Sequence, residues 1–364
     1  MHRAGRTSIG CVFLLVLLPA AGLAGDAATV LRELDDGSLE LEVLSRIYSV
    51  DREYRSMTGP WSTINLEILP DEEPQLLWIV GYRAEMVGPD GEAMPQSYMC
   101  HSNLDRDPTA HREIFGSDLR LTSRLFTLSQ GQLEIDFPNG FGLPLFSSEE
   151  VKLTTQVLDL NYAGGEAQVR HRVTLRFFRD RDLERSPKPL FAKGVYGLEL
   201  LEGHDGYFGL QEGANESEHG PGCLPGHNAA KDVYEDGLGR TFTGHWVVAP
   251  GRERNHTLVT RILNLPFDTR IHYIAVHLHP FAESVELFDL TAGETVFRSE
   301  TRPPLEGIGL AHVDSFSSAE GLPVYKGHEY AVVSVYNNTS GVPQDSMAVM
   351  SLYMTDRDFK APSR

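Results

Sequence analysis

The sequence is poor in basic residues. Its 364 residues contain 32 lysines and arginines against 51 aspartates and glutamates, which gives a formal net charge of -19 at pH 7. Nucleic acids and anionic membrane surfaces carry many negative charges, and they attract proteins with the opposite balance. The composition therefore excludes nucleic acid as an expected partner and disfavours an anionic membrane.

Cysteine is also scarce, with three residues in the whole chain. Cys11 lies in an apolar run near the N-terminus, which leaves Cys100 and Cys223 for the rest of the chain. In an oxidising compartment we expect these two to form a single disulfide. The alternative is that one of them is a metal ligand or stays a thiol.

Long apolar runs are missing, because no segment approaches the ~20 apolar residues of a membrane-spanning helix. The longest run, at residues 9–18, follows Arg3 and Arg6 and precedes small residues that end near Ala24. This is the pattern of a secretory signal peptide. We expect residues 1–24 to be removed and the mature protein to be periplasmic or secreted, with no membrane span.

Helical periodicity is almost absent, and short runs rich in β-branched and aromatic residues recur instead. Examples are LLWIVGYRAEMV (76–87), HRVTLRFF (171–178) and HYIAVHLHPF (272–281). Turn signals such as GPDG and NTSG divide these runs. The pattern predicts an all-β chain, built as two tandem jelly-roll β-sandwich domains.

The charged, proline-bearing stretch RDRDLERSPKP (179–189) lacks a core pattern. We therefore place the domain boundary there, with a first domain at 25–185 and a second at 186–364. An irregular stretch at 209–231 is too long for a plain connection. We read it as an excursion of the second domain that contains Cys223.

A short internal echo relates the two halves. LTTQVLDL (153–160) is similar to LVTRILNL (258–265), and a histidine-bearing strand follows each segment. Where the second copy has His277 and His279, the first has Arg176 and Phe178. Metal chemistry based on the histidine pair therefore belongs to the second half.

His277 and His279 are two residues apart in the apolar stretch IAVHLHPF. On a strand they share a face, with their Cα atoms ~7 Å apart. Such a pair is a common device for binding zinc, copper, iron or manganese. Met347 follows an Asp-Ser turn, an odd place for a core residue and a natural one for a thioether ligand. Two imidazoles and a thioether are a soft set that favours copper.

Other histidines are weaker candidates. His245 precedes the segment WVVAPG, and His312 lies in GLAHVDSF. Either is a candidate for an additional ligand, although a packed histidine is the more common role. Established catalytic motifs of other classes are absent: the chain has no G-x-S-x-G elbow, phosphate loop, dinucleotide fingerprint or H-E-x-x-H.

The second half resembles the copper type II, ascorbate-dependent monooxygenases, from about Val247 to Met354. The similar segments are VVAPG (247–251), IHYIAVHLHPFAESVELFDLTAGETVF (271–297), LPVYKGHEYAVVSVYNNTSG (322–341) and DSMAVMSLYM (345–354). In that family an HxH pair and a later methionine bind the oxygen-activating copper. The resemblance implies the ligands His277, His279 and Met347.

The first half is more distantly similar to that family, through FPNGFGLPLFSSEEVKLTTQVLDLNY (137–162). The family's second copper needs an adjacent histidine pair and a third histidine. The counterparts of the pair are Cys100 and His101, and the third position is Leu158. At most one of the three histidines is present, and substitution by His171 or Cys100 stays open.

The resemblance implies an exported enzyme with about one copper ion per chain, which activates dioxygen to hydroxylate an unidentified small molecule or peptide. Ala275 stands where the peptide-hydroxylating branch has an arginine, so peptide amidation does not carry over. Without a second copper, electrons must come from an external reductant such as ascorbate or from a partner.

Two alternatives stay open. The first is a copper-binding module without turnover, for storage, delivery or a structural role. The second is a cupin-like metal dioxygenase, because His277, His279 and Glu283 match part of the first cupin motif. This alternative requires His312 or His328 as a further ligand, and Ile271 stands where cupins have a glycine.

Overall fold

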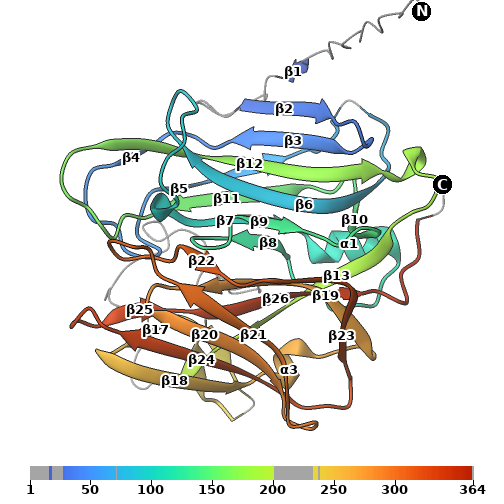
Figure 1. Cartoon of the computed structure of the whole chain (residues 1–364). Helices are drawn as coiled ribbons and strands as arrows, with labels where there is room; N and C mark the ends of the chain where they lie inside the picture. Colours follow the sequence, from blue (N-terminus) through green and yellow to red (C-terminus); the bar gives the residue numbers. More distant parts are fainter. Residues whose placement is uncertain (1–15, 19–27, 71, 201–232, 237, 363–364) are drawn as a thin grey trace, which may run out of the picture.

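The computed structural model describes residues 16–18, 28–70, 72–200, 233–236 and 238–362 (Figure 1). These residues form an all-β structure of stacked sheets with few helical turns, which confirms the predicted fold class. Figure 1 shows the strands of the first half above those of the second half.

One long sheet runs through both halves of the described chain. Its strands follow the order β1 (Val16–Leu18), β2 (Ala28–Glu33), β3 (Leu39–Leu44), β12 (Ala167–Arg179), β6 (Leu76–Val87), β10 (Phe141–Phe146), β13 (Lys188–Tyr196), β26 (Ala348–Thr355), β19 (Thr269–Leu278) and β23 (Phe316–Val324). Two short strands pair off this path: β4 (Tyr48–Val50) with β12, and β9 (Glu134–Asp136) with β6.

Each half adds a second sheet. The first-half sheet has the order β5 (Trp61–Leu66), β11 (Val151–Val157), β7 (Met99–Arg106) and β8 (Arg124–Leu128). The second-half sheet has the order β18 (Gly251–Leu258), β24 (Tyr330–Asn338), β20 (Ala282–Asp289), β21 (Glu294–Arg302) and β22 (His312–Val313). Smaller sheets pair β14 (Glu199–Leu200), β16 (Thr241–Thr243) and β15 (Val233–Glu235), and β17 (Trp246–Val248) with β25 (Gln344–Ser346).

The helical segments are short: α1 (Pro108–Phe115), α3 (Thr260–Leu263), and the 3-10 turns η1 (Gln96–Tyr98) and η2 (Asp180–Asp182). Asp107 caps α1 by accepting hydrogen bonds from the N–H groups of Thr109 and Ala110. No helix of the described residues is long and apolar enough to cross a membrane.

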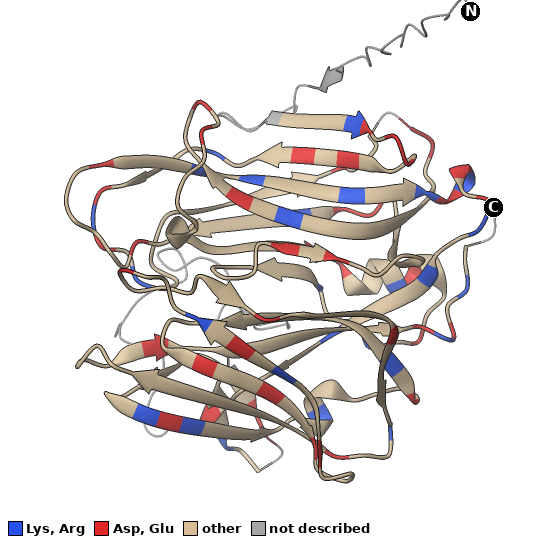
Figure 2. Cartoon of the chain, in the orientation of Figure 1, with Lys and Arg blue, Asp and Glu red and all other residues tan. Residues whose placement is uncertain are grey.

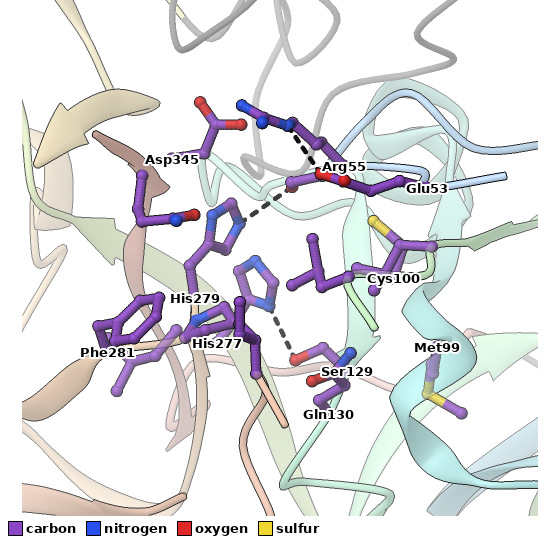
Figure 3. Close-up of a pocket in the computed structure, with 17 residues that line it drawn as sticks. Glu53, Arg55, Met99, Cys100, Ser129, Gln130, His277, His279, Phe281 and Asp345 are labelled. Atoms are coloured by element: carbon purple, nitrogen blue, oxygen red, sulfur yellow. Dashed lines mark hydrogen bonds and ion pairs between the residues drawn. The ribbon is translucent and has the colours of Figure 1, made fainter. Parts of the chain in front are cut away.

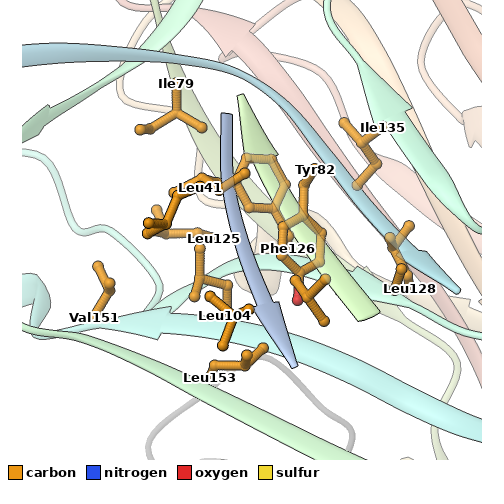
Figure 4. Packing of buried hydrophobic residues seen from close by; sticks show 14 of the residues in the cluster. Leu41, Ile79, Tyr82, Leu104, Leu125, Phe126, Leu128, Ile135, Val151 and Leu153 are labelled. Atoms are coloured by element: carbon orange, nitrogen blue, oxygen red, sulfur yellow. The ribbon is translucent and has the colours of Figure 1, made fainter. Parts of the chain in front are cut away.

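Two large cores fill the space between the sheets. The first packs β3, β6 and β12 against β7, β8 and β11, and Figure 4 shows Tyr82, Leu104, Phe126 and Val151 within it. The second packs β19 and β26 against β20 and β24. The chain passes between the cores along β13, which pairs with β10 on one side and β26 on the other.

The internal echo of the sequence is not an echo of the structure. Residues 153–157 belong to β11, whereas 258–265 end β18 and form the short helix α3. Val259 and Leu263 are both buried, and their spacing of four places them on one helical face. The two similar segments are therefore not structurally equivalent.

Several predictions concern residues that the structure does not describe. Most of the predicted signal peptide, the excursion at 209–231 and Cys223 lie outside the described residues. Within the signal segment, Val16–Leu18 pair with β2. The boundary near residue 185 and the disulfide between Cys100 and Cys223 stay predictions.

Charged side chains of both signs are interleaved on the outer strands (Figure 2). The strand β18 shows the alternation directly, with Arg252, Glu253 and Arg254 in succession. Nearby, Arg252 pairs with Glu283 at 3.0 Å. Basic and acidic residues are therefore mixed on these outer strands, although acidic residues outnumber basic ones in the chain as a whole.

Candidate metal centre

The histidine pair lies where β19 ends. His277 is the penultimate residue of the strand and His279 follows it directly; both are buried. Pro280 comes next, and its missing N–H cannot continue the ladder. Phe281 has a φ of 70°, which turns the chain away from the sheet. The sequence thus ends the strand just beyond the two imidazoles.

Alternation along β19 decides which way the imidazoles point. Val276 and Leu278 pack in the second-half core. Tyr273 and Ala275 pack in the first-half core instead. His277 continues the row of Tyr273 and Ala275, because side chains two residues apart share a face. The histidine pair therefore faces the first half of the chain and lies between the two cores.

Strand register brings Met347 beside the pair. Leu278 of β19 is paired with Ala348 of β26, and His277 with Val349. In the same register the next residues are His279 and Met347. Directly opposed side chains of antiparallel strands lie on one face, ~5 Å apart at Cβ. The fully buried Met347 is thus on the imidazole face.

The hydroxyl of Tyr336, in β24, bridges the backbones of His279 and Met347. It accepts hydrogen bonds from the N–H groups of His279 (3.2 Å) and Met347 (3.3 Å). It also donates a short hydrogen bond to the Met347 carbonyl. A side chain of the second core thereby fixes the His279 and Met347 backbones, where the ladder between β19 and β26 ends.

His245 joins the same cluster. Trp246 of β17 pairs with Ser346 of β25, so His245 lies opposite Met347 in register. The ring centroids of His245 and His279 are 5.4 Å apart, and those of His277 and His279 are 5.3 Å apart. The His245 Nε2 lies 3.9 Å from an Asp345 carboxylate oxygen. Of the additional candidates, His245 is thus adjacent to the pair.

Each imidazole of the pair has one nitrogen close to a serine of the first half. The His277 Nδ1 lies 2.8 Å from the Ser129 hydroxyl, and the His279 Nε2 lies 3.4 Å from the Ser56 hydroxyl (Figure 3). The other nitrogen of His277, Nε2, is buried and has no hydrogen-bond partner among the described residues. The His279 ring also interacts with the backbone of Asp345. A buried polar atom without a partner can be completed by an ion, a ligand or an ordered water. Other buried atoms of the described residues, among them both ring nitrogens of His171, are in the same state as the His277 Nε2.

Burial keeps both imidazoles neutral. Loss of solvent lowers the pKa of His277 well below its ordinary value, and the neighbouring His279 lowers it further. Burial, followed by the nearby His245, lowers the pKa of His279 to about 4. Asp345 and Cys100 act in the opposite direction on His279. Neutral imidazole is the form that binds a metal, so the pair needs no proton loss at neutral pH.

A cavity of about 70 Å³ opens beside the pair. Figure 3 shows Cys100 and Ser129 on one side of the imidazoles and Phe281 on the other. The exposed ion pair of Arg55 and Glu53 (3.1 Å) lies at its edge. The cavity is lined from the first half by Glu53, Arg55, Ser56, Met99, Cys100, Ser129, Gln130, Leu158 and Leu160, and from the second by His277, Leu278, His279, Pro280, Phe281, Ile308, Gln344 and Asp345.

The first-half candidates lie near this cavity. Cys100 and Leu158 line it. His101 is fully buried and close enough to lower the pKa values of His277 and His171. Leu158 has no donor atom, so the described first-half residues do not reproduce a three-histidine site.

The remaining candidates are elsewhere. His312 is paired with Asp314 at 3.0 Å, and His328 with Asp289 at 2.7 Å. The Glu283 carboxylate that the cupin alternative requires is in the surface ion pair with Arg252. Among the described residues, no three histidine, cysteine or carboxylate side chains are assembled to hold a metal.

Backbone strain is concentrated beside the pair. Among the described residues, the non-glycine residues with positive φ are Met57 (65°), Asn264 (38°) and Phe281 (70°). Asn264 ends helix α3, where a left-handed residue is common. Met57 and Phe281 both adjoin the cavity residues. Strain of this kind persists mainly at functional sites.

Sequence reasoning missed several residues of this centre. Three residues contact the histidines but are not part of a recognisable sequence motif: Ser129, Ser56 and Tyr336. Met57 is one of eight methionines in the chain, and its local sequence does not distinguish it from the others. Its proximity to Met347 depends on packing, which the sequence pattern does not reveal.

Comparisons with known proteins give no family. No protein-family model matches the chain, and no curated protein matches it. Among solved structures, the STIV MCP is 10% identical with a TM-score of 0.29, covering 85% of this chain and 97% of that chain. PNGase F, a glycosylasparaginase from Flavobacterium meningosepticum, is 8% identical with a TM-score of 0.33, covering 88% and 99%. These scores are too low to support an argument about function.

Proposed function

We propose that this chain is an exported copper protein that binds one copper ion through His277, His279 and Met347. In this proposal the copper activates dioxygen for hydroxylation of an unidentified substrate, and the mature protein is periplasmic or secreted. The observation that supports it most is the pair of buried, neutral imidazoles beside the buried Met347, of which the His277 Nε2 lacks a hydrogen-bond partner among the described residues.

The donor set fits copper. A metal on the His277 Nε2 requires the proton on Nδ1, from where it is donated to the Ser129 hydroxyl 2.8 Å away. A contact of this kind fixes the tautomer of a ligating histidine. The thioether of Met347 is a soft ligand that suits Cu(I) and is poorly matched to magnesium or calcium. Tyr336 fixes the backbone of both His279 and Met347.

When bound, copper would supply the one-electron chemistry with dioxygen that amino-acid side chains lack. The chain's own residues would orient the ion, keep the imidazoles neutral and limit access by water. Leu158 leaves the first half without a full second set of ligands, so the further electrons would come from an external reductant such as ascorbate or from an electron-donor partner.

Metal content is the direct test. The full chain, purified after exposure to copper, is expected to hold about one copper ion, and His279→Ala and Met347→Ala are expected to lose it. His312→Ala is the matched control, because that histidine pairs with Asp314 outside the cluster. Copper retained in both His279→Ala and Met347→Ala would refute the ligand assignment.

A second candidate function is copper binding without turnover. The small cavity favours it, because about 70 Å³ leaves little room beside the imidazoles, whereas small-molecule pockets usually span several hundred Å³. Oxygen uptake with ascorbate separates the two functions. Copper-dependent uptake that disappears in His277→Ala supports the oxygenase. Stoichiometric copper with no uptake above that of free buffer supports the binding module.

A further inference from the structure

Met57 belongs to a small apolar cluster that is separate from both large cores. The cluster contains Met57, Met347 and Val349. Met57 is 2% exposed and Met347 is fully buried. Val349 is paired with His277, and Met347 follows in register beside His279. The Met57 side chain therefore contacts the face of the sheet that carries both imidazoles.

The backbone of Met57 adopts a conformation that favours glycine. Its φ is 65°, and it is the third residue of a turn closed by a hydrogen bond from the Thr58 N–H to the Arg55 carbonyl (3.1 Å). Glycine or asparagine is usual at such a position. A methionine there indicates that its side chain has a role that glycine cannot fill.

The loop is held by the first half of the chain. Tyr54 and Asp159 exchange two backbone hydrogen bonds, of 3.0 and 2.9 Å, before the turn. After it, the Val157 N–H donates to the Pro60 carbonyl at 3.0 Å. Within the turn, the Ser56 hydroxyl lies 3.4 Å from the His279 Nε2. The turn is thus anchored on the end of β11 and lies over the histidine pair.

We propose that Met57 is a second thioether ligand, so that two imidazoles and two thioethers hold the ion between the two halves of the chain. This inference rests on the proposed copper site and adds to it a ligand from the first half. Thioethers select Cu(I) among the first-row ions. The reduced ion is therefore the form that the site takes up and retains.

The competing explanation is that Met57 only fills space, the usual role of a buried methionine. Leucine fills nearly the same volume without a sulfur atom and has the same unbranched Cβ at positive φ. Met57→Leu therefore removes the ligand and preserves the packing. Met350→Leu is the matched control, because Met350 is fully buried in β26 but packs in the second-half core.

The test is X-ray absorption at the copper edge, on the full chain produced with selenomethionine and loaded anaerobically with one equivalent of Cu(I). We expect two selenium and two nitrogen neighbours in the wild type. Met57→Leu and Met347→Leu should each leave one selenium neighbour, and Met350→Leu should leave two. A thiolate of Cys100 would appear as sulfur, which is distinguishable from selenium.

Competition with a chromogenic Cu(I) chelator gives an independent measure. Met57→Leu should bind Cu(I) at least about tenfold more weakly, since loss of even an outer partner of a metal site has an effect of this size. Met350→Leu should bind like the wild type. One selenium neighbour in the wild type, or unchanged Cu(I) affinity in Met57→Leu, overturns the Met57 assignment and leaves the copper site intact.

The same samples show whether the copper site itself fails. A wild-type chain that takes up no Cu(I), or His279→Ala that still binds it with two selenium neighbours, refutes the proposed function together with the inference. The thermal unfolding temperature of each copper-free variant verifies that the fold is preserved. A wild-type count of one selenium neighbour overturns the Met57 assignment without any substitution, even if a variant is unstable. A count of two is assigned to Met57 by its loss in Met57→Leu, because Met99 also lines the cavity.

Discussion

Strands β12 and β19 are both part of the long sheet, and both carry a buried histidine near their beginning or middle, His171 and His272. Five to seven residues later they differ. β12 continues with Arg176 and Phe178, whereas β19 continues with His277 and ends before His279.

The surroundings of the two strand ends explain the difference. Arg176 is half-exposed and pairs with Asp136 at 2.7 Å. His277 is covered by the first half, which contributes Ser129 at 2.8 Å. Burial excludes water from the imidazoles at the end of β19. This loss of solvent keeps both imidazoles neutral, and a histidine must be neutral to bind a metal. The candidate metal centre therefore depends on burial between the two halves of the chain. A place on a strand of the long sheet is not sufficient to form it.

Of the substitutions that test the difference between β12 and β19, Tyr336→Phe is expected to have the largest effect. The substitution removes the hydroxyl that bridges His279 and Met347 and leaves buried backbone groups without a partner. We expect the free energy of unfolding to fall by about 1–3 kcal/mol, and copper binding to weaken because the ligand backbones separate. Chemical denaturation and copper titration measure the two effects.

Tyr353→Phe is the control for Tyr336→Phe. Its hydroxyl donates to the Leu125 carbonyl at 2.8 Å, also buried but away from the histidine pair. A similar loss of stability with unchanged copper affinity is expected. If the two variants weaken copper binding equally, Tyr336 has no specific part in positioning the ligands.

An intermediate effect is expected from His171→Phe on β12. Burial, and then the neighbouring His101, lower the pKa of His171 from 6.5 to about 3. Between these pH values the unfolded chain binds a proton that the folded chain does not, so stability falls as the pH decreases. The histidine contributes a slope of up to about 1.4 kcal/mol per pH unit in this window.

The phenylalanine variant lacks this proton. We expect its free energy of unfolding to fall less steeply from pH 6.5 towards pH 4 than that of the wild type. Denaturant titrations at several pH values measure the slopes, and His312→Ala, at a half-exposed histidine, serves as the control. Parallel curves for wild type and His171→Phe would show that His171 is protonated in the folded chain at mild pH.

The smallest effect is expected from Arg176→Ala, at the place in β12 that corresponds to His277. Its ion pair with Asp136 is substantially exposed. Surface pairs of this kind stabilise a fold by about 0–1 kcal/mol. We expect a small change in the denaturation midpoint and none in copper content, measured beside His277→Ala. Loss of copper in Arg176→Ala would contradict the assignment of the histidine ligands to the end of β19 and show that β12 takes part in the site.

The all-β class and the orientation of the histidine pair follow from local pattern. Alternation in β19 predicts that His277 and His279 share a face, and Pro280 predicts the end of the strand. The sequence similarity between 153–160 and 258–265 wrongly suggested equivalent structures. The first segment contributes to strand β11, whereas the second contains the short helix α3. Short apolar runs fit both periods, and only tertiary packing decides between them.

By itself, the sequence determined an acidic, all-β chain with two imidazoles on one strand face and a thioether farther along. Only the tertiary structure decided that this face meets the first half, that Tyr336 fixes the His279 and Met347 backbones, and that Met57 lies over Met347. Ser129 and Ser56 are 148 and 223 residues from the histidines that they contact. Contacts over such separations depend on how two sheets pack, and a local pattern of apolar and polar residues does not specify that.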